Sequence, residues 1–351
     1  MFKKLLGIDL PIIQAPMAGV QDSALAIAVS VAGGLGSLPC GMLNTLDIEL
    51  ELTKIKDKTD KPFNINFFCH KTPEQNKVKE EEWYSTLEPY FLEYGVTKKD
   101  IISIPKREPF SHKIADIVMK YKPKVVSFHF GLPSDDLLAR VRGWGAKILS
   151  SATTIEEAIW LESRGVDGII AQGLEAGGHR GMFLTEDLTT QSGIFTLLPQ
   201  ILKNVGIPVI AAGGIADKKG VSAALSLGAV AVQVGTSYLL CKEAKTSQIH
   251  REALKCNHAH HTAVTNIFSG RPARSIINRA IKEIGAMPIT APPFPLASKV
   301  ISVLRHCAEK KGSSDFTPLW SGQNVTGCRE ISAKVLTHEL AKGYTSSLEI
   351  Q

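Results

Sequence analysis

Short apolar runs alternate with amphipathic stretches along most of the chain. The runs are rich in Val, Ile or Phe, as is typical of strands buried on both faces of a sheet. They are PIIQAP (11–16), GLGSLP (34–39), FNINFF (63–68), VVSFHFG (125–131), KILSSAT (147–153), GIIAQG (168–173), PVIAAGG (208–214) and AVQVGT (231–236). Between them lie helical patterns that end in Gly, such as 154–165 and 218–228. Eight strand–helix units favour an α/β fold of the (β/α)8 TIM-barrel type over an open doubly wound sheet.

Two stretches do not fit this alternation. Residues 71–105 are charged and predict a helical excursion after the third strand. Residues 241–330 follow the eighth strand and carry many prolines, which predicts a small, mainly helical second domain over the mouth of the barrel. Residues 331–343 have the pattern of the eighth barrel helix, reached after this insertion. We therefore expect a barrel of residues 1–240 plus 331–351 and a substrate-covering domain of residues 241–330.

Composition and charge exclude several classes of protein. The chain has 351 residues and a net charge of +6, with Lys and Arg scattered, so no nucleic-acid-binding patch is expected. No apolar window of about 18 residues predicts a membrane span, and the N-terminal stretch lacks the features of a signal peptide. The six cysteines never occur in CxxC spacing, which indicates reduced thiols in a cytoplasmic protein. HAHH (258–261) lacks acidic or Cys partners, so no metal is expected.

Glycines at the ends of the last two strands predict a phosphate site. In a TIM barrel the loops after strands seven and eight often bind phosphate, because Gly lets backbone N–H groups approach the anion. The residues concerned are Gly213 and Gly214 after the seventh strand, and Gln233, Val234, Gly235 and Thr236 at the end of the eighth. The sequence has neither a P-loop nor a GxGxxG dinucleotide fingerprint, which favours a cofactor with one phosphate. The alternative, that these glycines only make tight turns, stays open.

The run AQGLEAGGHRG (171–181) follows the sixth strand and is the strongest candidate for chemistry. The carboxyl end of a barrel strand faces the active-site mouth, so we expect Gln172 to point there, with Gly177 and Gly178 allowing backbone to approach a ligand. His179 follows, and histidine is the side chain best suited to move a proton near neutral pH or, when charged, to hold an anion. The alternative is that His179 only braces the loop.

Seven segments together resemble the nitronate monooxygenases, formerly called 2-nitropropane dioxygenases. They are PIIQAPMAGV (11–20), NINFF (64–68), SFHFGLP (127–133), AQGLEAGGHRG (171–181), PVIAAGGIAD (208–217), QVGTSYL (233–239) and SGRPAR (269–274), and PLWSGQ (318–323) extends the similarity towards the C-terminus. The resemblance implies a (β/α)8 barrel with FMN and a small second domain. It also implies oxidation of alkyl nitronates by O2 to a carbonyl compound and nitrite, without a metal or reduced nicotinamide, in the detoxification of compounds such as propionate-3-nitronate.

The resemblance also implies roles for individual residues. His179 corresponds to the catalytic histidine of the family, which acts as base on the carbon next to the nitro group or binds a preformed nitronate anion. The positions implied to contact the flavin or its phosphate are Pro16, Met17, Asn66, Gln172, Gly177, Gly214, Gln233, Val234, Gly235 and Thr236. With Gly178 and Gly213 from the strand pattern, these residues form the predicted FMN site.

The chain departs from the family pattern in residues 292–304. Related sequences carry tyrosines and a lysine here, where this chain has Phe294, Ser298 and Ser302. We therefore expect a more apolar or differently gated substrate pocket, with Phe294 either on its wall or packed within the second domain. His129 also has two interpretations, contact with the substrate and packing in the barrel.

Two other functions would use the same features. A flavin-dependent enoyl-acyl-carrier-protein reductase shares the barrel and the glycine–histidine loop, and would consume NADH or NADPH. A non-catalytic flavin-binding accessory protein would keep the cofactor loops without turnover. The segments QAPM, SFHFG and AQGLEAGGHRG favour the monooxygenase, whose partners would be a small nitronate and O2. The sequence leaves the oligomeric state open.

Overall fold

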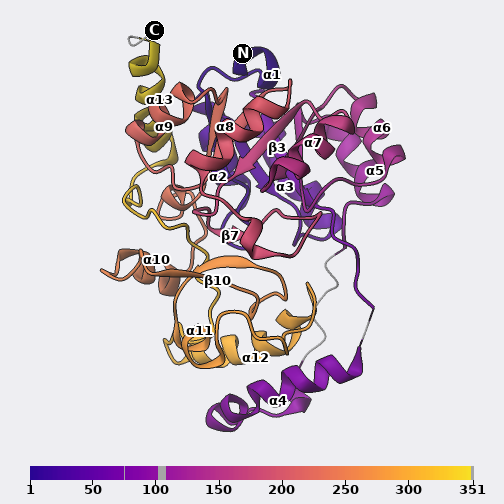
Figure 1. The fold of residues 1–351 in the computed structure, drawn as a ribbon, viewed down its shortest axis with the longest axis vertical. Coiled ribbons are helices and arrows are strands. Elements are labelled where there is room, and N and C mark those ends of the chain that lie inside the picture. The colour runs from indigo at the N-terminus through magenta and orange to yellow at the C-terminus, as the bar shows by residue number, and fades with distance from the viewer. Residues whose placement is uncertain (75, 102–107, 349–351) are drawn as a thin grey trace.

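Eight parallel strands form a barrel, as the sequence predicts (Figure 1). The computed structural model describes residues 1–74, 76–101 and 108–348. The strands are β1 (Ile12–Gln14), β2 (Gly36–Pro39), β3 (Phe63–Phe68), β4 (Val125–His129), β5 (Lys147–Ala152), β6 (Gly168–Gln172), β8 (Val209–Ala212) and β9 (Ala231–Val234). They pair in the order β1-β9-β8-β6-β5-β4-β3-β2. The ring closes between β1 and β2, where Leu35 N–H donates to Ile12 O at 2.8 Å and Gln14 N–H to Leu35 O at 2.9 Å.

The barrel strands are buried on both faces, because successive side chains point to opposite sides of the sheet. In β6, Ile169 packs outward in the layer between strands and helices. Ile170 packs on the inner side with side chains of α1 (Phe2–Leu6), which closes one end of the barrel. The other helices around the barrel are α2 (Ser23–Val31), α3 (Thr45–Lys58), α5 (His112–Tyr121), α6 (Asp135–Gly143), α7 (Ile155–Ser163), α8 (Ile194–Asn204), α9 (Lys218–Ser226) and α13 (Ala333–Leu348). Helix α13 packs against α9 and α2 and so completes the ring.

A second lobe lies at the other end of the barrel, beside the carboxyl ends of the strands (Figure 1). It includes several helices from the C-terminal part of the chain and a small antiparallel sheet. These are α10 (Gln248–Lys255), α11 (Arg279–Ile284), α12 (Ala297–Lys310), β10 (Thr262–Thr265), β11 (Ala273–Ile276) and β7 (Gly178–His179). Strand β7 belongs to the loop that follows β6 and pairs with β11. The sheet of the second lobe therefore includes a piece of the barrel's own sixth loop.

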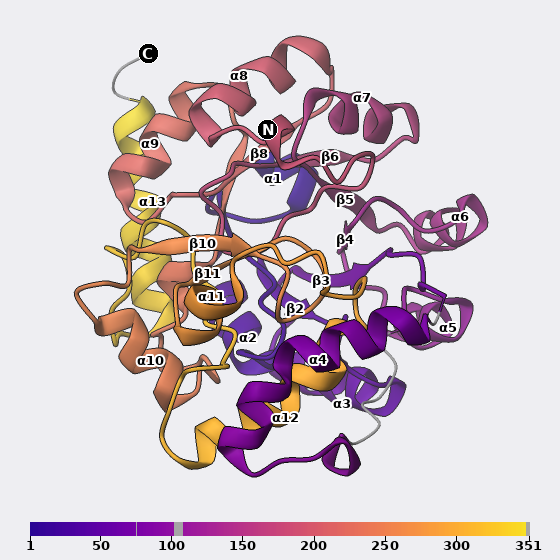
Figure 2. The same cartoon turned by 60° about the horizontal axis from the view of Figure 1, so that its bottom comes forward.

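The charged excursion after β3 forms helix α4 (Lys77–Tyr94), which packs along α12 of the second lobe (Figure 2). Trp83, Leu87 and Phe91 recur every four residues, so they share one face of α4, and all three are buried in the core of that lobe. The Trp83 indole N–H donates to Ala297 O at 3.1 Å. By packing, α4 joins the second lobe, which the expected domain of residues 241–330 does not include. Residues 75 and 102–105 of the predicted excursion lie outside the described residues.

Three further features bear on what the composition predicts. In the described ranges, no helix is both long and apolar enough to cross a membrane. All six cysteines are free thiols. Within the same ranges, no group of three or more His, Cys, Asp or Glu side chains is placed to hold a metal ion.

Candidate active site

A cavity of about 500 Å³ lies between the carboxyl ends of the barrel strands and the second lobe. Almost all the predicted site residues line it: Pro16, Met17, Asn66, His129, Gln172, Gly177, Gly178, His179, Gly213, Gly214, Gln233, Gly235 and Thr236. Two of them do not reach it. The Val234 side chain is buried in the barrel wall, and Phe294 packs in an aromatic cluster with Phe68 and Phe130. The strand ends therefore bring the predicted residues together, although their roles stay predictions.

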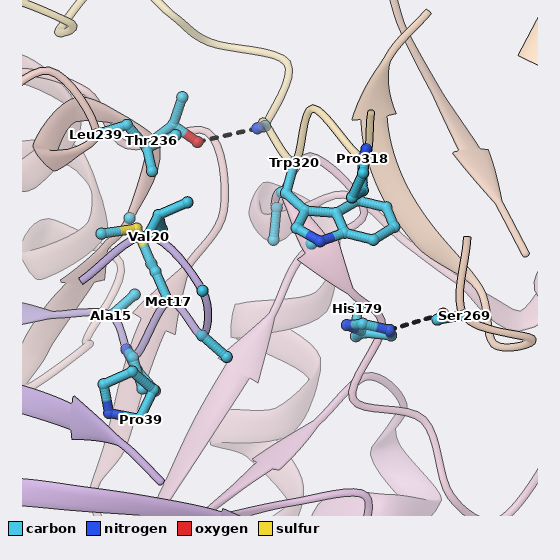
Figure 3. A pocket seen from close by; sticks show the side chains of 18 of the residues that line it. Ala15, Met17, Val20, Pro39, His179, Thr236, Leu239, Ser269, Pro318 and Trp320 are labelled. Carbon is cyan, nitrogen blue, oxygen red and sulfur yellow. Dashed lines mark hydrogen bonds between the residues drawn. The ribbon is translucent and has the colours of Figure 1, made fainter. Parts of the chain in front are cut away.

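The predicted phosphate loops have the backbone conformation that their glycines suggest. Gly213 and Gly214 have φ values of 120° and 68°, which residues with a side chain rarely adopt. A segment near the C-terminus packs onto these loops: Gly322 N–H donates to Thr236 Oγ1 at 2.9 Å (Figure 3), and Asn324 Nδ2 donates to Gly214 O at 2.9 Å. The loops are therefore held from outside the barrel, by residues more than a hundred positions away in the case of Asn324.

A side chain is disfavoured at both adjacent glycines of the sixth loop, for a different reason at each. A Cβ on Gly177 would lie 2.4 Å from Gly322 N and 2.5 Å from Ser321 C, so the close approach at this residue is to the protein's own backbone. A Cβ on Gly178 would meet nothing within 4 Å, but its φ of 69° is left-handed. Gly177 thus completes the contact between the sixth loop and the 321–324 segment, a role that the glycine pattern alone did not reveal.

The imidazole of His179 faces the cavity among aromatic side chains. Its Nε2 is 2.8 Å from Ser269 Oγ (Figure 3), and its ring centroid is 5.4 Å from Trp320 and 5.5 Å from Phe294. Pairing of β7 with β11 places the His179 backbone opposite Ala273 of the second lobe. The histidine is therefore fixed by the barrel loop on one side and by the second lobe on the other.

Two polar side chains hold the carbonyl of His179. Gln172 Nε2 donates to it at 3.0 Å, while Gln172 Oε1 accepts from Gly181 N–H at 2.7 Å. His129 Nε2 lies 3.2 Å from the same carbonyl, so this nitrogen carries the proton, and Nδ1 accepts from Ser151 Oγ at 3.0 Å. Burial lowers the pKa of His129 to about 4, which keeps the ring neutral at physiological pH. Both groups thus support the sixth loop as well as lining the cavity.

A buried guanidinium and a carboxylate secure the rest of the loop. Arg180 is fully buried and donates to Gly173 O at 2.7 Å and to Gln172 O at 2.8 Å, which ties the end of β6 to the loop. Burial lowers the pKa of Arg180 to about 10, so it remains charged at neutral pH. The Ile194 N–H donates to the Glu175 carboxylate, with both oxygens 3.0 Å from the nitrogen. Arg180 and Glu175 therefore tie the sixth loop to the end of β6 and to the start of α8.

Both the sequence and the structure match known proteins. The family model described as nitronate monooxygenase matches residues 1–343. The chain belongs to the nitronate monooxygenase family. It is 42% identical to a nitronate monooxygenase of Paraburkholderia phytofirmans, over 98% of this chain and 95% of that protein, and 39% identical to one of Pseudomonas aeruginosa, over 97% and 98%. The structure of a nitroalkane oxidase from Streptomyces ansochromogenes matches with a TM-score of 0.89 at 35% identity, covering 100% of this chain and 99% of that one.

In this member of the nitronate monooxygenase family, α12 forms one wall of the cavity. Ser298 and Ser302 line the cavity, whereas Phe294, just before the helix, is buried behind His179. The sequence singled out these three positions but not other lining residues, among them Trp320, Gly322 and Asn324 of the C-terminal segment and Lys245 and Arg305. The segment PLWSGQ (318–323), part of the family resemblance, contains Trp320 and Gly322. The sequence alone does not show which loop this segment contacts.

Proposed function

We propose that this oxidoreductase is an FMN-dependent nitronate monooxygenase, which oxidises alkyl nitronates with O2 to a carbonyl compound and nitrite. The observation that carries the proposal is the placement of His179. Its imidazole faces a cavity that is also lined by the glycine loops after β8 and β9. The names of the relatives, nitronate monooxygenase and nitroalkane oxidase, support the same chemistry.

The residues present fit FMN. Gln233 Oε1 is buried, lies on a cavity-lining residue and has no hydrogen-bond partner among the described residues, so it calls for an N–H or O–H donor from a bound group. Gly214, Gly235 and Thr236 are the residues that would hold the phosphate, because they combine glycine turns with the start of η3 (Thr236–Tyr238). Pro16 and Met17 would lie beside the flavin ring. When bound, FMN supplies the redox chemistry that passes electrons from the substrate to O2.

The protein's own contribution is to position the substrate and move its proton. With a neutral nitroalkane, the proton of the carbon next to the nitro group moves to the His179 imidazole, and the C–H electron pair moves into the nitro group to give the nitronate. With a preformed nitronate, the protonated imidazole holds the anion by a hydrogen bond. Ser269 at 2.8 Å from Nε2 orients the ring in both cases. Phe268 and Trp320 on the cavity wall exclude water from the reacting carbon.

One purification and two assays test the proposal. The flavin released on denaturation is identified by chromatography, and the enzyme is then given the nitronate of nitroethane while nitrite release and O2 consumption are measured. We expect FMN, and nitrite formation without any nicotinamide. FAD in the released fraction would overturn the cofactor assignment. NADPH oxidation with an enoyl thioester, and no nitrite, would instead favour the enoyl-acyl-carrier-protein reductase.

The biological setting is also part of the proposal. We expect the enzyme to work in the cytoplasm and to remove toxic nitronates such as propionate-3-nitronate. The six free cysteines are compatible with a reducing compartment. Sensitivity of a deletion strain to added propionate-3-nitronate, with rescue by the wild-type gene, is the measurement that checks the detoxifying role.

A further inference from the structure

One face of α12 lines the active-site cavity over two helical turns. Its members are Ser298, Ile301, Ser302, Arg305 and His306, at the spacing that brings side chains to one side of a helix. At about 1.5 Å of rise per residue, the backbone positions of Ser298 and Arg305 are about 10 Å apart along the helix axis. Phe294, just before the helix, has its ring centroid 5.5 Å from that of His179. The cavity therefore extends from His179 along α12 to Arg305.

The part of the cavity between these two ends suits an alkyl chain. Ile301 of α12 and Phe268, Phe316 and Trp320 from the rest of the second lobe line it. The two remaining α12 residues on this stretch, Ser298 and Ser302, have small side chains that leave the space along the helix open. The hydroxyls of both serines are turned to carbonyls of their own segment, Pro295 O at 2.7 Å and Lys299 O at 3.3 Å. Because both hydroxyls already donate to backbone carbonyls, they need no hydrogen bond from a ligand.

The far end of the cavity carries positive charge. Arg305 Nε donates to Glu309 Oε1 at 2.7 Å, and the same oxygen accepts from Thr317 Oγ1 at 2.9 Å, so the guanidinium is held in place through one nitrogen. Its two terminal nitrogens have no hydrogen-bond partner among the described residues, and the side chain is 41% exposed. Among the described residues that line the cavity, the one carboxylate is that of Glu175, which is engaged with Ile194 N–H. An anion that enters the cavity would therefore reach the two terminal nitrogens of Arg305, while Nε stays paired with Glu309.

We propose that this enzyme takes nitronates with an extended alkyl tail that ends in a carboxylate, and that Arg305 binds this carboxylate. The inference rests on the proposed function, because it places the nitronate carbon near His179. The two terminal nitrogens of a guanidinium match the two oxygens of a carboxylate. A longer chain between the nitronate carbon and the carboxylate would help both groups reach their sites together, because the backbone positions of Ser298 and Arg305 are about 10 Å apart along the helix. We therefore expect a longer nitronate to be the preferred substrate, with propionate-3-nitronate oxidised less efficiently.

The experiment compares four nitronates by nitrite release: those of nitroethane, 3-nitropropionate, 1-nitrohexane and 6-nitrohexanoate. In the wild type, we expect kcat/KM for 6-nitrohexanoate nitronate to exceed that for 1-nitrohexane nitronate and that for 3-nitropropionate nitronate. In Arg305→Gln, the ratio of the charged to the uncharged six-carbon substrate should fall by about 10- to 100-fold, as for the loss of hydrogen bonds to a charged group. Ser302→Phe, which fills the passage, should lower kcat/KM for both six-carbon substrates relative to nitroethane nitronate.

Lys299→Gln is the matched control, because Lys299 is on the same helix, pairs with Glu80 at 3.9 Å and does not line the cavity. This variant should keep the wild-type ratio of the two six-carbon substrates. If the short nitronates are oxidised but that ratio is near one in the wild type, or is the same in Arg305→Gln, the tail-binding inference is wrong and the proposed function stands. If no nitronate yields nitrite, the proposed function and this inference fail together.

Discussion

Gly177→Ala tests how the C-terminal segment holds the proposed cofactor loops. The added Cβ would lie 2.4 Å from Gly322 N and 2.5 Å from Ser321 C. Both are backbone atoms, so rotating a side chain cannot relieve the contact, and the backbone of residues 321–322 must move away. That movement would stretch the hydrogen bond from Gly322 N–H to Thr236 Oγ1, which is 2.9 Å long. The substitution therefore acts on a proposed phosphate-binding residue without touching it.

The expected loss of unfolding free energy is the sum of overpacking and a weakened hydrogen bond. Overpacking costs about 1–3 kcal/mol of unfolding free energy, and the loss of one hydrogen bond adds about 1 kcal/mol. Gly178→Ala is the matched control, because the same atom is added at the next residue, where nothing lies within 4 Å. Its cost is that of placing Ala in a left-handed conformation, about 1–2 kcal/mol. We expect Gly177→Ala to be destabilised by about 2–4 kcal/mol and Gly178→Ala by about half as much.

Urea unfolding of the flavin-free proteins, followed by circular dichroism, measures both changes. The ratio of flavin to protein absorbance after purification is the second readout. It should fall in Gly177→Ala, because the 321–324 segment positions both Thr236 and Gly214. The reasoning is refuted if Gly177→Ala is as stable as Gly178→Ala, or if it is less stable and still retains stoichiometric flavin.

Three further predictions concern the site and its pH dependence. His179→Asn should lower kcat/KM for neutral nitroalkanes by about 10²–10⁴-fold, as for loss of a general base. It should lower kcat/KM less for preformed nitronates and leave the flavin content unchanged. Equal losses on both substrates would favour anion binding. Gly214→Asp places a side chain at a φ of 68° and a negative charge at the proposed phosphate site, so it should abolish FMN retention, and a folded variant with full flavin would contradict that assignment. Burial lowers the pKa values of His129 and His250 to about 4. The unfolded chain therefore binds more protons, and unfolding free energy should fall as pH drops from about 6.5 towards 4; urea midpoints at pH 7, 5.5 and 4.5 check this, and a flat profile would contradict it.

The barrel was predictable because its physical signal is local. A strand buried on both faces reads as a continuous apolar run, and each of the eight runs contains one barrel strand. The partner of α4 was not predictable in this way. Trp83, Leu87 and Phe91 show that α4 has a buried face, but a helical stripe does not say which element it meets. Only the folded chain brings α4 against α12, more than two hundred residues later.

The candidate site was predictable to the extent that it depends on strand ends. Because parallel strands in a barrel end at one rim, residues as distant in sequence as Asn66 and Thr236 line one cavity. The contacts that hold His179 come from elsewhere. Ser269 is ninety residues away from it in the chain, and Gly322 reaches the sixth loop through Gly177. Such contacts depend on how the second lobe packs, which no spacing in the sequence encodes.

The barrel loops carry the proposed flavin contacts, whereas α12 of the second lobe faces the rest of the cavity. This separation has a consequence for substrate specificity. The proposed flavin contacts come from loops whose conformation depends on positive φ at Gly213 and Gly214, so few substitutions are compatible with them. The α12 face is different, because its side chains project into open cavity and its backbone is an ordinary helix. Replacing Ser298 or Ser302 changes the shape of the cavity while the β6, β8 and β9 loops stay as they are. We therefore expect that substitutions on this one helix can direct the same oxidation to different nitronates, with Ser298, Ser302 and Arg305 as the positions that line the cavity.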